Sequence, residues 1–393
     1  MLEPPRADAN KASQGSVIED PVIEGLRGFA ALIVMATHYR YMLTPEIGLW
    51  GFGGTGVDLF FVLSGYVFGP YLVGKPLSLR AHLIRRFFRL YPLYFCALLL
   101  YVALRLPGSS AWDHFWVHLG MGHTLASLEI ANFYNPAFWS LPPEVEYYLL
   151  LPLLAWFSVR HRSGRFGFLW LVLLAAVMHL ALVAVVSTDE KGVTPRSLAT
   201  VHFPGLLVEF MLGSLAYAAV RRDTDRAAAL IRLILGLLIL TSMGFIFVNY
   251  VAPVEGIARN VPFWLGGNFG LGAALGYALI VSGLARVPQR VAIVAIPVKN
   301  RLAAGSPMLP RFWPTASFQS VYIVFGELSY GVYLFHNAAP QILGRILPQV
   351  GGGTAVLVCT GMTFLMAIAA HHAIEKPMRA YGRRLSQTFA RSK

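Results

Sequence analysis

Long apolar stretches recur along the whole chain, and each is about as long as a helix that crosses a lipid bilayer. A spanning helix needs roughly 20 mainly apolar residues. Ten stretches meet this need, near residues 22–44, 53–74, 88–106, 138–159, 166–187, 202–220, 230–249, 262–285, 325–347 and 354–375. The pattern predicts an all-α, polytopic integral membrane protein with about ten transmembrane helices.

Two further segments are neither spanning helices nor simple loops. Residues 110–137 contain Trp112, Trp116 and other aromatic residues but no Lys or Arg, which is typical of an interfacial or re-entrant segment. Residues 286–317 include the apolar run Val291–Val298, which is too short to span and is predicted to lie on the membrane surface. We find no internal repeat, which disfavours the commonest transporter architectures.

The composition excludes several other classes of protein. Of the 393 residues, 56% are apolar and 13% are charged, whereas soluble domains carry roughly 25% charged residues. So much apolar surface excludes a soluble enzyme, and the high hydrophobicity excludes disorder. Cys96 and Cys359 both lie in apolar stretches, so neither a disulfide framework nor a metal site is expected. No basic soluble domain is present that would bind nucleic acid.

The basic residues alternate between the two sides of the predicted helices. The formal net charge is +13, and the loops on one side hold 24 Lys and Arg while those on the other side hold 4. Because basic loops mark the cytoplasmic side, both termini are predicted to be cytoplasmic. The first 20 residues lack the order of a cleavable signal peptide, so the first apolar stretch is expected to remain as an anchor. We predict a cytoplasmic tail over 1–21, a membrane domain over 22–379 and a basic cytoplasmic tail over 380–393.

Ionisable residues inside the predicted helices are the main functional signal, because a charge is costly in a bilayer. Arg27 and His38 are eleven residues apart, about 16.5 Å along one face of a helix. Asp58 and Glu144 fall near the starts of helices that begin at the side where His38 lies. We therefore expect His38, Asp58 and Glu144 at one depth, with His38 as a general base that a carboxylate orients.

A second group of charges is expected at the cytoplasmic side. Arg85 and Arg89, or Arg86 and Arg89, share a helical face just before Tyr91, and Arg27 lies at the same end of the bundle. Guanidinium groups are suited to binding phosphate. This cluster therefore predicts a site for a polyanionic cytosolic ligand.

The ninth predicted helix adds a further set of polar side chains. His336 falls near the middle of this stretch, and an intramembrane histidine is a functional candidate. Tyr330, Tyr333 and Asn337 are positioned to line the same cavity.

Taken together, these motifs resemble those of the membrane acyltransferase-3 family. The resemblance runs in order over nearly the whole chain, from about residue 22 to 379. It rests on Gly25–Gly28 with His38, Gly56–Gly65, Arg86–Pro92, Phe138–Leu141 with Glu144, Ser329–His336 and Glu375–Pro377. Pro142 and Pro143 are an unusual feature at the start of the helix that carries Glu144.

The resemblance implies an enzyme of the bacterial cytoplasmic membrane that moves an acyl group, commonly acetyl, from cytosolic acyl-CoA to a hydroxyl of a glycan or glycolipid. The acceptor would be an exopolysaccharide, a lipopolysaccharide or a similar molecule. Acetyl-CoA would be a substrate, and no cofactor would be bound permanently. The implied roles are catalysis by His38, Asp58 and Glu144, coenzyme A binding by Arg27, Arg86 and Arg89, and substrate binding by Ser329, Tyr330, Tyr333 and His336.

The residues leave the mechanism and the class of protein open. His38 can deprotonate the acceptor hydroxyl for direct attack, or it can carry the acyl group as a covalent intermediate. A proton-coupled transporter would use the same buried His, Asp and Arg groups as a relay, and a membrane scaffold would need none of them. The oligomeric state is not predicted.

Overall fold

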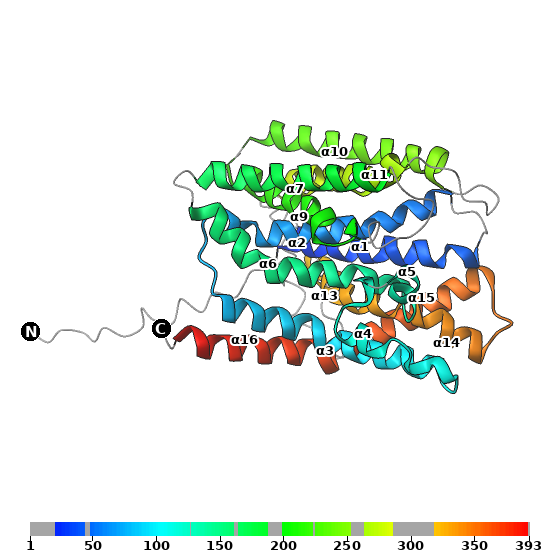
Figure 1. The fold of residues 1–393 in the computed structure, drawn as a ribbon. Helices are drawn as coiled ribbons and strands as arrows, with labels where there is room; N and C mark the ends of the chain where they lie inside the picture. The colour runs from blue at the N-terminus through cyan, green and yellow to red at the C-terminus, as the bar shows by residue number, and fades with distance from the viewer. Residues whose placement is uncertain are drawn as a thin grey trace, which may run out of the picture.

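The computed structural model of this protein describes residues 20–43, 48–125, 127–160, 164–187, 199–222, 225–252, 263–285 and 318–391. All regular secondary structure in these ranges is helical, which confirms the predicted all-α class. Long helices lie roughly side by side in one bundle (Figure 1). They are α1 (Pro21–Tyr39), α2 (Gly56–Leu72), α3 (Leu79–Arg105), α6 (Leu141–Arg160), α7 (Gly164–Ser187), α9 (Phe203–Arg222), α10 (Arg226–Ile246), α11 (Phe263–Leu284), α13 (Phe318–Phe335), α14 (Ala338–Ile346), α15 (Gly352–Ala370) and α16 (Lys376–Arg391).

Seven helical segments in the described part of the chain are long and apolar enough to cross a membrane. They are Gly48–Leu72, Leu79–Arg105, Gly167–Val185, Phe203–Arg222, Arg226–Val251, Leu265–Leu284 and Gly352–Phe389. The protein is therefore a polytopic membrane protein. The three other predicted ranges form α1, α6 and α13, whose polar residues build the site described below.

Side chains that face outward from the bundle agree with a lipid environment. On α7, Leu169, Trp170 and Leu173 are each at least half exposed, and on α10 the same is true of Leu237 and Leu238. In water such a large apolar surface would be unstable. Both helices lie at one side of the bundle, with α2, α9 and α1 deeper inside (Figure 1).

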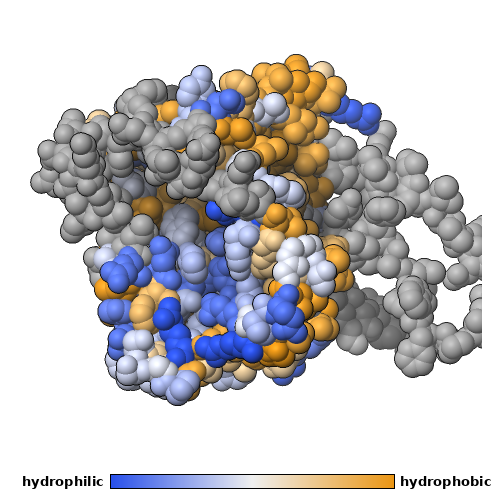
Figure 2. Space-filling model, turned by 90° about the vertical axis from the view of Figure 1, so that its right-hand side faces the viewer, coloured by the Kyte–Doolittle hydropathy of each residue, from blue (hydrophilic) through white to orange (hydrophobic). Residues whose placement is uncertain are grey.

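The two ends of the bundle differ in charge. Basic residues gather where α2, α6 and α9 end and α3 begins, namely Lys75, Arg80, Arg160, Arg221 and Arg222. We call this the basic end. Seen from the opposite end, hydrophilic side chains gather around a hollow over the lower half of the molecule, and hydrophobic ones cover its upper rim (Figure 2). The opposite end therefore offers a polar surface beside an apolar flank.

The closest helix crossing joins α2 and α9. A Cβ placed on Gly65 of α2 would lie 1.9 Å from the carbonyl oxygen of Phe210, and one on Gly213 of α9 would lie 1.9 Å from that of Val62. Only glycine allows the two backbones to approach so closely. The Ser214 hydroxyl, which donates to the Gly65 carbonyl at 2.9 Å, holds the same crossing together.

The segment 110–137 does not cross the bundle. It forms short helical turns, namely η3 (Ser109–Trp112), α4 (Phe115–Leu119), η4 (His123–Leu125) and α5 (Leu128–Asn132), followed by η5 (Pro136–Ser140). Trp112 and Trp116 are exposed while Phe115 is buried. This arrangement agrees with the expected interfacial or re-entrant segment. The predicted surface segment 286–317 lies outside the described residues, as does the tail before residue 20.

The chain after α15 continues as one helix. A short π-helical stretch, His371–Glu375, leads directly into α16, and α16 lies along α3 (Figure 1). The rings of Tyr381 and Phe88 are 5.1 Å apart, and Gly382 lets the two helices pack closely there. The predicted boundary between residues 379 and 380 therefore falls inside a helix that packs on the bundle.

Candidate active site

A small cavity between α1, α2, α3, α6 and α13 collects most of the predicted site residues. Its volume is about 50 Å³, which is enough for one or two water molecules. Six residues of its lining were predicted from the sequence, namely Arg27, Arg89, Glu144, Ser329, Tyr330 and Tyr333. Helices from four separate parts of the sequence thus bring these side chains together.

The arginines in this cavity are matched by carboxylates. Arg27 Nη1 lies 3.3 Å from Glu24 Oε1, one turn earlier on α1. Arg89 interacts electrostatically with Glu24, Glu144 and Glu375. Because charges inside a membrane protein are paired, a phosphate group that binds here has to displace or rearrange these carboxylates.

Arg86 lies next to this cavity but does not line it. Its guanidinium is 5.0 Å from the centre of the Phe68 ring and 5.7 Å from that of Tyr148. The Tyr148 hydroxyl in turn donates to Glu144 Oε1. Arg86 therefore supports the cavity from behind Tyr148, and the predicted pairing of Arg86 with Arg89 in one lining is not seen.

Glu144 lies deeper in the bundle than predicted. Its Oε1 accepts a hydrogen bond from Ser64 Oγ at 3.3 Å, halfway along α2, and it lines the cavity together with Arg27 and Arg89. The reason is the segment before α6. Ser140, at the end of η5, already contacts the Tyr333 hydroxyl at 2.6 Å, so α6 begins inside the bundle rather than at its surface.

His38 pairs with a second histidine instead of a carboxylate. His336 Nε2 lies 3.2 Å from His38 Nδ1, and the two ring centres are 4.8 Å apart. His336 is fully buried, whereas His38 is partly exposed. Among the described residues no carboxylate forms a hydrogen bond or ion pair with the His38 ring, so the expected orientation of His38 by Asp58 or Glu144 is not observed.

The hydrogen bonds of the two rings determine where their protons lie. His38 Nδ1 is 2.9 Å from the Val34 carbonyl oxygen, and His336 Nδ1 is 3.2 Å from that of Val332. A carbonyl only accepts, so each neutral ring carries its proton on Nδ1. The one Nδ1 hydrogen of His38 is then shared between the Val34 carbonyl oxygen and His336 Nε2. His38 Nε2 is left with a lone pair, as a general base requires.

A helix break fixes the position of His336. The predicted span 325–347 divides at His336 into α13 and α14, so His336 lies at the end of a helix and not in its middle. Pro340 has no N–H to donate to the His336 carbonyl four residues earlier. The Tyr39 hydroxyl of α1 donates to that carbonyl instead, at 2.8 Å. The last turn of α1 therefore holds both His38 and the end of α13.

Neighbouring amides complete this break. Asn337 Nδ2 donates to Asn135 Oδ1 at 2.7 Å, and Asn135 Nδ2 donates to the Leu334 carbonyl at 3.1 Å. Asn337 is partly exposed beside the histidine pair, and it is not among the residues that line the cavity with Tyr330 and Tyr333.

Asp58 belongs to a different cluster on the other side of α2. It is hydrogen-bonded to Glu209 of α9, and two carboxyl groups that share a hydrogen bond must hold a proton between them. A Cβ on Gly270 of α11 would lie 2.6 Å from Asp58 Oδ1 and 3.2 Å from Glu209 Oε1. Asp58 thus packs against Glu209 and α11, and the predicted contact between Asp58 and His38 is not observed among the described residues.

The arginine cavity and the histidine pair are neighbours separated by aromatic rings. The Tyr333 ring is 5.9 Å from that of His336 and 5.6 Å from that of Phe60, and both Tyr333 and Phe60 line the cavity. A passage from the arginines to His38 would therefore run past Tyr333 and Phe60, which close it in this conformation.

The sequence places this arrangement in a family. Residues 20–372 match the family model described as "Acyltransferase domain". The chain belongs to the acyltransferase-3 family. The acyltransferase MdmB of Streptomyces mycarofaciens is 31% identical over 153 residues, which are 35% of this chain and 39% of that protein. The peptidoglycan O-acetyltransferase OatA of Listeria monocytogenes is 30% identical over 152 residues, 34% of this chain and 23% of that protein.

These acyltransferase-3 relatives cover the chain only in part. The matched region spans well under half the length of either curated protein. No solved structure matches the chain.

Several residues of the acyltransferase-3 site were missed by the sequence reasoning. Glu24 and Glu209 are acids within or next to apolar helices, so the rule that selected Asp58 would have found them. Ser64 and Tyr148, which bind Glu144, are neutral and carry no such signal.

Proposed function

We propose that this protein transfers an acyl group, most simply acetyl, from acyl-CoA to a hydroxyl group of a glycan or glycolipid. The observation that carries the proposal is His38, whose Nδ1 is committed to Val34 and His336, so that Nε2 is available as a base. Arg27 lies on the same helix and lines the neighbouring cavity, where phosphate groups can bind. A base and an anion site on one helix fit a reaction that joins an anionic donor to a hydroxyl.

The proposed topology follows the distribution of charge. Basic loops mark the cytoplasmic side, so the basic end would face the cytoplasm, with about ten crossings and both termini inside, in a bacterial cytoplasmic membrane. Acyl-CoA would then enter at the basic end. The hydrophilic hollow of the opposite end would admit a polar acceptor such as a polysaccharide or lipopolysaccharide (Figure 2).

The arginines would hold the donor. Arg27 and Arg89 would bind the coenzyme A phosphates, and Glu24 would release Arg27 as the ligand enters. Arg86, held between Phe68 and Tyr148, would add long-range attraction and support Tyr148. Ser329, Tyr330 and Tyr333 would contact the donor chain or the acceptor, because they line the same cavity.

The chemistry assigned to His38 is proton transfer. Its Nε2 would take the proton of the acceptor hydroxyl as that oxygen attacks the thioester carbonyl carbon. When the carbon–sulfur bond breaks, the same proton would pass from Nε2 to the departing thiolate, giving an ester and coenzyme A. His336 would act as a positioning residue, since its Nε2 accepts the Nδ1–H of His38 while that ring is positively charged. An acyl-histidine intermediate uses the same Nε2 as the nucleophile.

A conformational change has to precede this reaction. A cavity of about 50 Å³ is too small for the pantetheine arm of coenzyme A. The rings of Phe60 and Tyr333 stand between the arginines and the histidine pair. Donor binding would therefore move one or both rings aside, which couples loading of the donor to access to His38.

The decisive experiment follows acetyl label from acetyl-CoA into the glycans of membranes that contain the protein. His38→Ala is expected to abolish transfer, while substitution of His372, an exposed histidine in the π-helical stretch before α16, by alanine is expected to leave it intact. Equal transfer by wild type and His38→Ala, at equal protein level, would refute the proposal. Label trapped on His38 would select the covalent route.

A second candidate function is a proton-coupled transporter. The buried pair of Asp58 and Glu209 favours it, because Glu209 Oε2 has no hydrogen-bond partner in the described structure. A transporter would move protons in vesicles without any acyl donor, and Asp58→Asn would stop that movement. The acyltransferase needs acyl-CoA, and its coenzyme A binding would be lost in Arg89→Gln.

A further inference from the structure

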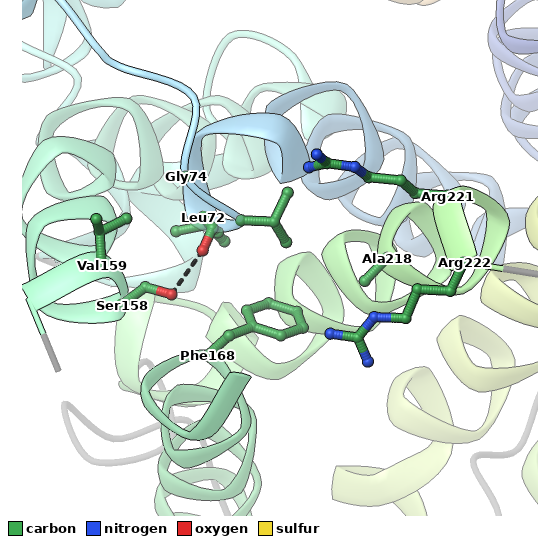
Figure 3. A pocket seen from close by; sticks show the side chains of 9 residues that line it. Leu72, Gly74, Ser158, Val159, Phe168, Ala218, Arg221 and Arg222 are labelled. Carbon is green, nitrogen blue, oxygen red and sulfur yellow. Dashed lines mark hydrogen bonds between the residues drawn. The ribbon is translucent and has the colours of Figure 1, made fainter. Parts of the chain in front are cut away.

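A second and larger cavity opens at the basic end, away from the candidate active site. It lies between the ends of α2, α6 and α9 and the start of α7, and its volume is about 440 Å³ (Figure 3). It shares no lining residue with the arginine cavity. The proposed acyl transfer therefore gives it no role.

One side of this basic-end cavity is apolar. Leu72 of α2, Phe168 of α7 and Ala218 of α9 are buried in its wall, and Val159 of α6 is half exposed at its edge. The hydrogen of the Ser158 hydroxyl is donated to the Leu72 carbonyl at 2.6 Å (Figure 3). This wall is suited to hydrocarbon and not to a sugar or a nucleotide base.

The other side carries two positive charges. Arg221 and Arg222 extend from the end of α9 toward the cavity, from the side opposite Ser158 and Val159 (Figure 3). Successive residues of a helix point about 100° apart, yet both of these line the one cavity. Among the described residues no carboxylate pairs with either guanidinium, whereas Arg27 is paired with Glu24. The cavity thus presents to an anion two guanidinium groups that no described carboxylate neutralises.

The cavity lies at the level expected for lipid headgroups. Trp156, one turn before Arg160 on α6, is 54% exposed, and the Arg160 guanidinium lies 4.8 Å from the centre of its ring. Exposed tryptophan and arginine at the end of a spanning helix are typical of the membrane interface. Val159 belongs to the same turn of α6 and lines the cavity, so the cavity edge faces this interface.

We propose that the basic-end cavity binds an anionic phospholipid of the surrounding leaflet. Arg221 and Arg222 bind its phosphate, and the wall of Leu72, Phe168 and Ala218 contacts the first part of an acyl chain. A soluble anion would use the two arginines and leave the apolar wall exposed to water. A zwitterionic lipid would gain less from two uncompensated guanidinium groups.

The test measures phosphatidylglycerol bound to the purified protein by native mass spectrometry, with phosphatidylcholine as the reference lipid. The variant Arg221→Gln/Arg222→Gln is expected to lower phosphatidylglycerol affinity about thirty-fold, because each arginine near an anionic headgroup contributes roughly five-fold. The matched control is Arg383→Gln/Arg384→Gln, a consecutive and exposed pair on α16 that lines no described cavity. The control is expected to bind as the wild type does.

A variant that fills the cavity tests the contribution of the cavity's shape separately from that of its two arginines. Val159→Trp keeps both arginines, and Val159 is exposed enough to accept a larger side chain. It is expected to lower phosphatidylglycerol binding as well. The proposal is overturned if the two double variants lose binding equally, if phosphatidylcholine binds as well as phosphatidylglycerol, or if inorganic phosphate or coenzyme A competes fully for the site.

Discussion

The crossing of α2 and α9 gives the sharpest prediction for stability, and Gly65→Ala is the perturbation. A methyl group at this position would lie 1.9 Å from the Phe210 carbonyl oxygen, whereas an ordinary contact is at least 3.4 Å. The two helices would have to separate by most of that difference, because the obstacle is backbone and not a flexible side chain.

The size of the effect follows from what the separation disrupts. Overpacking of this kind costs about 1–3 kcal/mol. The bond from Ser214 Oγ to the Gly65 carbonyl, 2.9 Å long, would be stretched or lost, which costs about 0.6 kcal/mol more inside a membrane. We therefore expect Gly65→Ala to lower the free energy of unfolding by about 1.6–3.6 kcal/mol. The displacement of α2 would also weaken the contact between Ser64 and Glu144.

The assay is thermal unfolding of the purified protein in detergent, followed by tryptophan fluorescence. Gly361→Ala on α15 is the matched control, since no atom lies within 4 Å of a Cβ at that helical position. It is expected to leave the midpoint unchanged or slightly raised. Equal midpoints for Gly65→Ala and Gly361→Ala would show that the tight crossing of α2 and α9 is not present in the protein.

Two further predictions concern hydrogen bonds around the site. Tyr39→Phe leaves the His336 carbonyl without a donor, so the free energy of unfolding should fall by about 1 kcal/mol and acyl transfer should decrease. The fluorescence and transfer assays described above measure these two effects. Unchanged values in both assays would contradict the role of Tyr39. Burial lowers the pKa of His202, but its hydrogen bonds to Glu146 Oε1 (2.6 Å) and the Thr124 carbonyl (3.1 Å) outweigh this and leave the pKa above 6.5. Protonated His202 therefore stabilises the fold fully below pH 6.5, and this stabilisation is lost as the pH rises through the raised pKa. The difference in unfolding midpoint between wild type and His202→Gln should then shrink from pH 6 to pH 9. A difference that stays constant with pH would refute this assignment.

The sequence was sufficient to locate helices but not to locate their ends in space. Apolar length alone predicts helices over each of the ten ranges, because backbone groups in lipid must be satisfied within a helix. It does not reveal that η5 enters the bundle and places Glu144 beside Ser64. The break at His336 has a signal, Pro340, which the apolar length of the stretch conceals.

The sequence predicts which residues belong to the site more fully than it predicts the contacts between them. Intramembrane charge identifies Arg27, Asp58 and Glu144 without reference to any neighbour. The helix that Asp58 faces depends on the close crossing of α2 and α9, which Gly65 and Gly213 allow. That crossing brings together residues that are far apart in the chain. The pairing of His38 with His336 depends in the same way on how α1 packs against α13.

The ring pair of Phe60 and Tyr333 has a consequence for the cell as a whole. A bundle with a continuous wet path from one face to the other would leak protons across the membrane. The rings of Phe60 and Tyr333 are 5.6 Å apart, and the Tyr333 hydroxyl contacts Ser140 at 2.6 Å. Aromatic rings packed in this way leave little room for water in that part of the bundle.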